Sequence, residues 1–124
     1  MFGWFKKKPP VPAEAVPESK WRVTLDDVQI RVQSASGQMR SVSKADLGAV
    51  VIATNDSGPW GADVWWLLFD SSKQQACSFP QGAVGEDAAI DFLFTLPSFN
   101  HQQMINAMSS TEEAFFPVWE KPEM

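Results

Sequence analysis

The sequence predicts an α+β protein: an antiparallel curved sheet, or a partly open barrel, of six to seven strands with two C-terminal helices. Apolar and polar residues alternate in short segments up to residue 79, as they do in half-buried strands. From residue 86 the apolar residues recur at helical spacing instead. Turn clusters separate the strand segments, and we expect strands joined by short turns to be antiparallel neighbours.

Six strand segments precede the helices. They are expected over residues 21–25, 28–32, 38–42, 49–54, 64–69 and 74–79. A brief connection or a single helical turn is expected over residues 43–48. The nearly continuous apolar run at 49–54 indicates a strand covered on both faces or a buried edge. The segment 64–69 is the most apolar of the chain and is expected to lie centrally in the sheet.

The first helix is expected over residues 86–96, with Glu86 and Asp87 in its first turn, where the helix dipole favours negative charge. Pro97 ends it because proline cannot continue a helix. Asn100 and Gln103 resemble a capping box that begins a second helix.

That second helix is expected to run to about residue 108, with Met104, Ile105 and Met108 facing inward. A short strand over residues 115–119 follows. Pro117 within it indicates the edge of the sheet, because proline has no backbone N–H to donate to a neighbouring strand.

The composition is that of an ordinary globular domain, with 124 residues, 44% of them hydrophobic and 20% charged. The net charge of −5 argues against nucleic acid as a partner. A single Cys and a single His exclude a disulfide framework and multi-histidine zinc sites. We expect a single α+β domain over residues 21–124, with no metal and no cofactor.

Residues 1–20 are basic and proline-rich and are expected to be a disordered tail. In one interpretation, the aromatic residues Phe2, Trp4 and Phe5 enter a membrane interface while the lysines Lys6, Lys7 and Lys8 attract anionic lipid. In a second, the tail is a docking peptide for an aromatic-lined groove. In a third, its composition is incidental. The apolar stretch is too short to span a bilayer and lacks the order of a signal peptide, which predicts a cytoplasmic protein. Peripheral association with the inner membrane is the alternative that the first interpretation implies.

Few residues suggest catalysis, and we expect no enzymatic activity. His101 is expected to be an exposed residue at a helix start, because no nucleophile motif accompanies it. Cys77 is expected to be a small core residue. The aspartates at predicted turns do not follow a calcium-loop pattern and are expected to stabilise turns; they are Asp26, Asp27, Asp56, Asp63 and Asp70.

A protein-interaction surface is the clearest functional signal in the domain. Trp65 and Trp66 are adjacent in a strand and therefore point to opposite faces, so one of them, with Trp60, is expected to form an exposed aromatic patch. Burial under tail or loop residues is the alternative. Asp63, Glu86 and Asp87 supply acidic groups for the same surface. The glycines of residues 80–87 are interpreted as a strand-to-helix turn or, alternatively, as a site that recognises a partner's backbone or basic side chain.

The order of elements resembles the pleckstrin-homology-like superfold over residues 21–96. The segments Asp63–Trp66, Pro80–Asp87 and Leu96–Phe99 also resemble small uncharacterised bacterial proteins. That resemblance implies no known activity. The sequence therefore predicts a non-enzymatic protein-interaction module with an unidentified protein partner; the alternative is a peripheral inner-membrane protein held to an anionic surface by residues 2–8.

Overall fold

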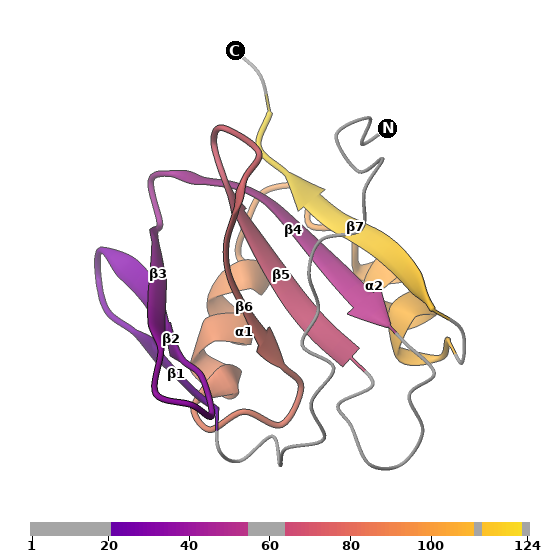
Figure 1. Ribbon diagram of the computed structural model, residues 1–124. Coiled ribbons are helices and arrows are strands. Elements are labelled where there is room, and N and C mark those ends of the chain that lie inside the picture. The colour runs from indigo at the N-terminus through magenta and orange to yellow at the C-terminus, as the bar shows by residue number, and fades with distance from the viewer. Residues whose placement is uncertain (1–20, 55–63, 111–112, 123–124) are drawn as a thin grey trace.

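Two antiparallel sheets organise the structure, a computed structural model that describes residues 21–54, 64–110 and 113–122 (Figure 1). The smaller sheet has the order β1-β2-β3, from Arg22–Leu25 (β1), Gln29–Gln33 (β2) and Met39–Ser43 (β3). The larger has the order β6-β5-β4-β7, from Leu47–Thr54 (β4), Val64–Asp70 (β5), Gln75–Pro80 (β6) and Ala114–Glu120 (β7). The α+β class is thus confirmed, and the sheets are open.

The expectation that every pair of strands joined by a short turn would be neighbours is wrong at one place. β3 and β4 follow each other but belong to different sheets. The chain turns after β3, where the N–H of Asp46 donates to the carbonyl of Ser43 at 3.1 Å, and β4 begins at Leu47. Both edges of β4 are taken by β5 and β7, so β3 has no edge to join.

β4 is the centre of the larger sheet, and all eight of its residues are buried. Ile52 is opposite Trp66 on β5 and Phe116 on β7, so these three residues lie in one row across the sheet. The prediction from the continuous apolar run is therefore confirmed. β7 pairs with β4 alone among the described strands, which confirms the edge position indicated by Pro117.

Both helices lie on the same side of the larger sheet (Figure 1). α1 (Glu86–Phe94) contacts β1, and α2 (His101–Met108) contacts β7 and β4. Asn100 caps α2, since its side-chain oxygen accepts from the N–H of Gln103 at 3.0 Å, as the capping pattern predicts. α1 ends at Phe94, two residues earlier than expected, where Thr95 caps it through the carbonyl of Phe92.

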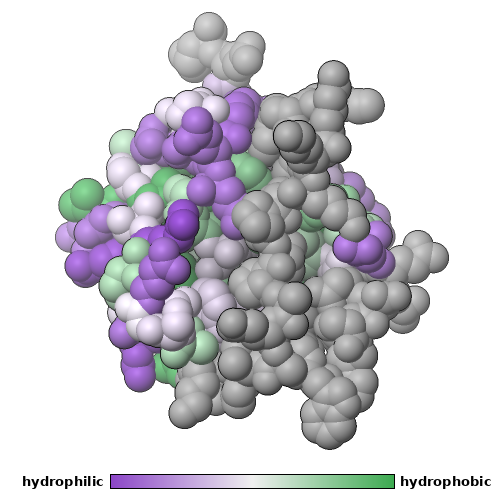
Figure 2. Space-filling view, in the orientation of Figure 1, coloured by the Kyte–Doolittle hydropathy of each residue, from purple (hydrophilic) through white to green (hydrophobic). Residues whose placement is uncertain are grey.

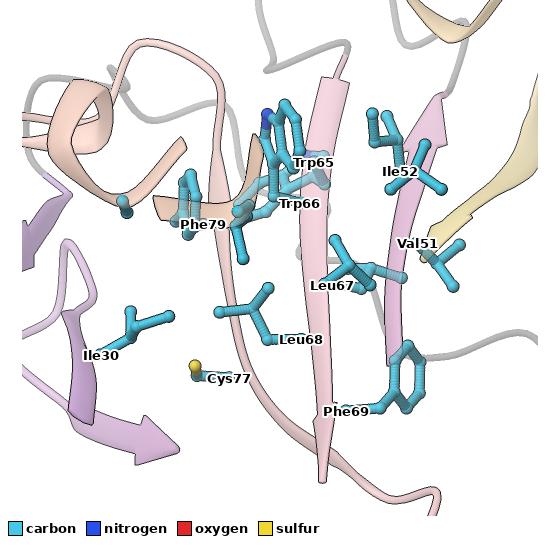
Figure 3. Close-up of a cluster of buried hydrophobic side chains, with 14 of the residues drawn as sticks. Ile30, Val51, Ile52, Trp65, Trp66, Leu67, Leu68, Phe69, Cys77 and Phe79 are labelled. Atoms are coloured by element: carbon cyan, nitrogen blue, oxygen red, sulfur yellow. The ribbon is translucent and has the colours of Figure 1, made fainter. Parts of the chain in front are cut away.

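β5 separates two groups of buried side chains (Figure 3). Leu67 and Phe69 point to one side of the strand. Leu68 points to the other side, toward Cys77 of β6 and Ile30 of β2 in the smaller sheet. The smaller sheet contributes to the core through this contact of β2 and β3 with β6. Because successive residues of a strand point to opposite faces, both faces of β5 carry buried side chains.

The turn between β6 and α1 is held by β1. Val84 forms a parallel bridge with Arg22 at one edge of β1: its carbonyl accepts from the N–H of Val23 at 2.7 Å, and its N–H donates to the carbonyl of Trp21 at 2.9 Å. Gly85 follows at φ +86°, a left-handed conformation that glycine adopts without strain. A Cβ atom at Gly85 would lie inside the contact distance of the Val23 carbonyl oxygen. No side chain therefore fits where α1 starts.

The substitution Gly85→Ala is expected to lower the free energy of unfolding by roughly 3 kcal/mol or more, because it combines a strained φ with a backbone clash. Gly37→Ala is the matched control: Gly37 has φ +93°, and a Cβ there meets nothing within 4 Å. That variant should lose only about 1 kcal/mol, the conformational cost alone. Urea denaturation measures both values, and equal losses would contradict the close approach of Gly85 to β1.

Candidate interaction groove between the two helices

A groove of about 250 Å³ lies on the side of the sheet that carries the helices. We call it the α1–α2 groove. Its walls come from both helices, and its floor comes from β5 and the start of the turn after β6. The lining residues are Trp66, Gln81, Glu86, Asp87, Ile90, Phe94, Met104 and Met108. The groove thus joins apolar side chains to two carboxylates at the N-terminal end of α1.

Trp66 forms the floor and is only 1% exposed. Its ring stacks on Phe79 of the neighbouring strand, with centroids 6.3 Å apart and planes within 9°. The indole N–H is buried and has no hydrogen-bond partner among the described residues. A buried donor without a partner costs about 1–3 kcal/mol.

Glu86 is the second group with unused bonding capacity. One of its carboxylate oxygens, Oε2, accepts from the N–H of Gly82 at 2.7 Å and so braces the turn before the helix. The other oxygen, Oε1, is buried and has no partner in the described part of the chain. Burial raises the pKa of the Glu86 carboxyl above its ordinary value, and the neighbouring charge of Asp87 raises it further, against the Gly82 hydrogen bond that lowers it.

The charged side chains that line the α1–α2 groove are both acidic, namely Glu86 and Asp87. Residues 74–120 contain six acidic side chains and no lysine or arginine. In α1 the charged residues are Glu86, Asp87 and Asp91. A cleft with apolar walls and charges of one sign concentrates the electric field, and this field attracts ligands of the opposite charge. The groove therefore favours a cationic ligand.

The apolar end of the groove is built around Phe94. Its ring lies 5.3 Å from that of Phe99 and 5.1 Å from the imidazole of His101, both edge-on. These contacts join the end of α1 to the start of α2. Phe94 and Met108 are nevertheless 36% and 40% exposed, which is high for large apolar side chains. Figure 2 shows the molecule from the side away from the helices, where small hydrophilic and hydrophobic areas alternate among the described residues that are visible.

Three of the residues predicted for interaction, Trp66, Glu86 and Asp87, come together in the groove. Trp65 does not: it lies on the opposite face of β5, 3% exposed, with the Trp21 ring edge-on at 5.1 Å. The prediction that one of the paired tryptophans would be exposed is therefore wrong, because each face of β5 is covered.

The other predicted interaction residues lie outside the described residues. They are Trp60 and Asp63 of the proposed aromatic patch, and Phe2, Trp4, Phe5, Lys6, Lys7 and Lys8 of the proposed membrane contact. The membrane interpretation of the tail stays a prediction.

The groove also uses residues that the sequence placed in the core. Ile90, Phe94, Met104 and Met108 were assigned to inward helix faces, yet they form its walls. Ile105 was expected to face inward and is 54% exposed; Ala107 takes the buried position of α2 instead. The useful signal was present in the spacing of four residues between Met104 and Met108, and between Ile90 and Phe94, which gives each helix an apolar stripe.

The residues considered for catalysis or metal binding occupy positions that have a structural explanation. Cys77 is buried, and burial raises the pKa of its thiol to about 12. His101 is exposed at the start of α2. Asp26 accepts from the N–H groups of Val28 and Gln29 in its turn, and these bonds lower its pKa. Within the described ranges no three His, Cys, Asp or Glu side chains gather as metal ligands.

The comparisons with known proteins identify no relative: no family model, no curated protein and no solved structure matches the chain. The resemblance to small bacterial proteins with a pleckstrin-homology-like body stays a prediction. Among the described residues, no helix has the length and apolar character needed to cross a membrane.

The substitution Glu86→Gln tests the burial of this carboxyl. Because the folded state raises its pKa above 4.5, Glu86 contributes most to stability below that pH, and this contribution is lost as the pH rises through the folded-state value. Glutamine keeps an acceptor for Gly82 but has no charge to bury. The stability of E86Q relative to the unsubstituted protein should therefore increase as the pH rises from acidic to neutral.

Chemical denaturation at a series of pH values measures this difference. Asp91→Asn removes a carboxylate from the same helix outside the groove and controls for the change in helix charge. A relative stability of E86Q that falls as the pH rises would contradict burial as the dominant influence on Glu86.

Proposed function

We propose that this protein is a non-enzymatic protein-interaction module that binds a partner peptide in the α1–α2 groove. The observation that carries the proposal is the combination, in one groove, of partly exposed large apolar side chains and the carboxylates of Glu86 and Asp87. Phe94 and Met108 are 36% and 40% exposed there. Exposed apolar area bordered by polar groups is typical of a surface that a partner covers.

The chemistry of the groove limits the class of partner. Apolar walls favour an aliphatic or aromatic side chain, and the carboxylates of Glu86 and Asp87 favour a lysine or arginine beside it. At about 250 Å³ the groove is smaller than the roughly 300–1,000 Å³ of typical small-molecule sites. It suits one or two side chains of a peptide better than a cofactor.

The acidic surroundings support the same partner. A negative field raises the association rate of a basic segment and disfavours acidic competitors. The apolar contacts then determine how long the complex lasts, since affinity differences lie mostly in the dissociation rate. We therefore expect binding that weakens moderately with salt and strongly when an apolar wall is replaced.

A peptide library displayed on phage and selected against the full chain tests this function. The selected peptides should pair an apolar residue with a lysine or arginine. Met108→Gln should weaken their binding about fivefold, the effect of losing about 1 kcal/mol of partial apolar burial.

Ile105→Gln is the matched control. Ile105 lies on the same helix, is 54% exposed and does not line the groove, so the substitution should leave affinity unchanged. Selected peptides that bind both variants as well as the unsubstituted protein would exclude the α1–α2 groove as the binding site.

A further inference from the structure

We propose that the groove binds the N-terminal segment of the same chain, residues 2–8, as an internal ligand. The inference rests on the proposed function of the groove and names its occupant. An intramolecular ligand would make the module self-inhibited: an outside partner must compete with the segment for Trp66 and Glu86.

The composition of the segment is complementary to the groove, which has room for one or two of its side chains. Three aromatic residues, Phe2, Trp4 and Phe5, are followed at once by three lysines, Lys6, Lys7 and Lys8. The groove offers apolar walls and two carboxylates. The charges agree on a larger scale too, because residues 1–20 carry a net charge of +2 and the remainder carries −7.

The described chain begins beside the acidic end of the groove. The carbonyl of Trp21 accepts from the N–H of Val84 at 2.9 Å, and Val84 precedes Glu86 by two residues. The Trp21 backbone therefore lies near the end of the groove that carries Glu86 and Asp87, while its ring packs against Trp65 on the other face of β5, so the segment before Trp21 would have to pass to the helix side to enter the groove.

The length of the intervening chain is sufficient. Residues 9–20 contain four prolines and, at about 3.1 Å per residue in an extended form, would span up to about 37 Å. The nine residues of α1 cover only about 14 Å. A connection of this length gives an effective concentration on the order of millimolar, so even a weak contact would be occupied.

The order of the residues fits as well. Along the chain away from Trp21, the lysines come before the aromatic residues. Along the groove away from Trp21, the carboxylates of Glu86 and Asp87 come before Phe94, which lies beside His101 at the far end. Lysines at the acidic end and aromatic rings against the apolar walls follow from a single direction of entry.

Methyl NMR of the full chain tests the proposal, because the ε-methyl groups of Met104 and Met108 line the groove and respond to the ring currents of a bound aromatic side chain. Replacement of Phe2, Trp4 and Phe5 by Ser should shift both signals. Met39, 54% exposed on β3, should not move. Unchanged Met104 and Met108 signals would overturn the proposal.

A charge exchange supplies the second variant. Asp87 is exposed, so Asp87→Lys is compatible with the fold; it should shift the two methionine signals toward those of the Ser-substituted chain. The further substitution Lys7→Asp should restore the original positions. Failure of this restoration while M108Q still weakens the binding of the selected peptides would reject the internal ligand and keep the proposed function.

Competition distinguishes the remaining outcomes. A phage-selected peptide should bind the Ser-substituted chain at least about tenfold more tightly than the unsubstituted chain, since the internal competitor is gone. Methionine shifts that disappear on dilution would instead assign the contact to a second copy and overturn the intramolecular arrangement. Peptides that show no dependence on the groove at all would reject both proposals.

Discussion

The burial of β4 on both faces is the constraint on which the rest of the structure depends. Eight consecutive residues without access to water require neighbours on both edges and cover on both faces. β5 and β7 occupy the edges, and the two helices cover one face. β7 follows both helices in the chain, so the last described strand completes the pairing of the central strand β4. The apolar area removed from water there is the main stabilising contribution available to a domain of this size.

The turn between β6 and α1 links this core to the groove. Val84 bonds to β1, Gly85 leaves no room for a side chain against Val23, and Glu86 returns a carboxylate oxygen to Gly82. The smaller sheet, the start of α1 and the acidic end of the groove therefore share one set of backbone contacts. A ligand that drew Glu86 away from Gly82 would loosen the same turn, which gives groove occupancy a direct path to the stability of β1.

Much of the fold could be predicted because periodicity and capping are local. Alternation located the strands, and Asn100 with Gln103 located the start of α2. Which of the apolar residues become buried was harder to predict from the sequence. Periodicity shows that Met104, Ile105 and Met108 share an apolar character, but only the position of α2 over β7 decides that Ile105 faces outward. Trp65 and Trp66 could be assigned to opposite faces from the sequence, whereas the cover over each face depends on distant parts of the chain. The groove could not be predicted from the sequence for the same reason, because it forms where β5 and both helices come together in space.

The groove follows from the way the helices are attached. α1 is held against β1 of the smaller sheet, while α2 is held against β7 and β4 of the larger one. Their closest described ring contacts, Phe94 with Phe99 and His101, lie at the connection between them. Each helix therefore packs against a different sheet. The apolar side chains of the two helices line opposite walls of the groove, with Trp66 at its floor. Closing that space by moving either helix would break contacts with a strand, so filling it from outside the helix pair is the less costly way to bury the exposed parts of Ile90 and Met108. The space between the helices therefore persists because each helix is held in place by its own strands.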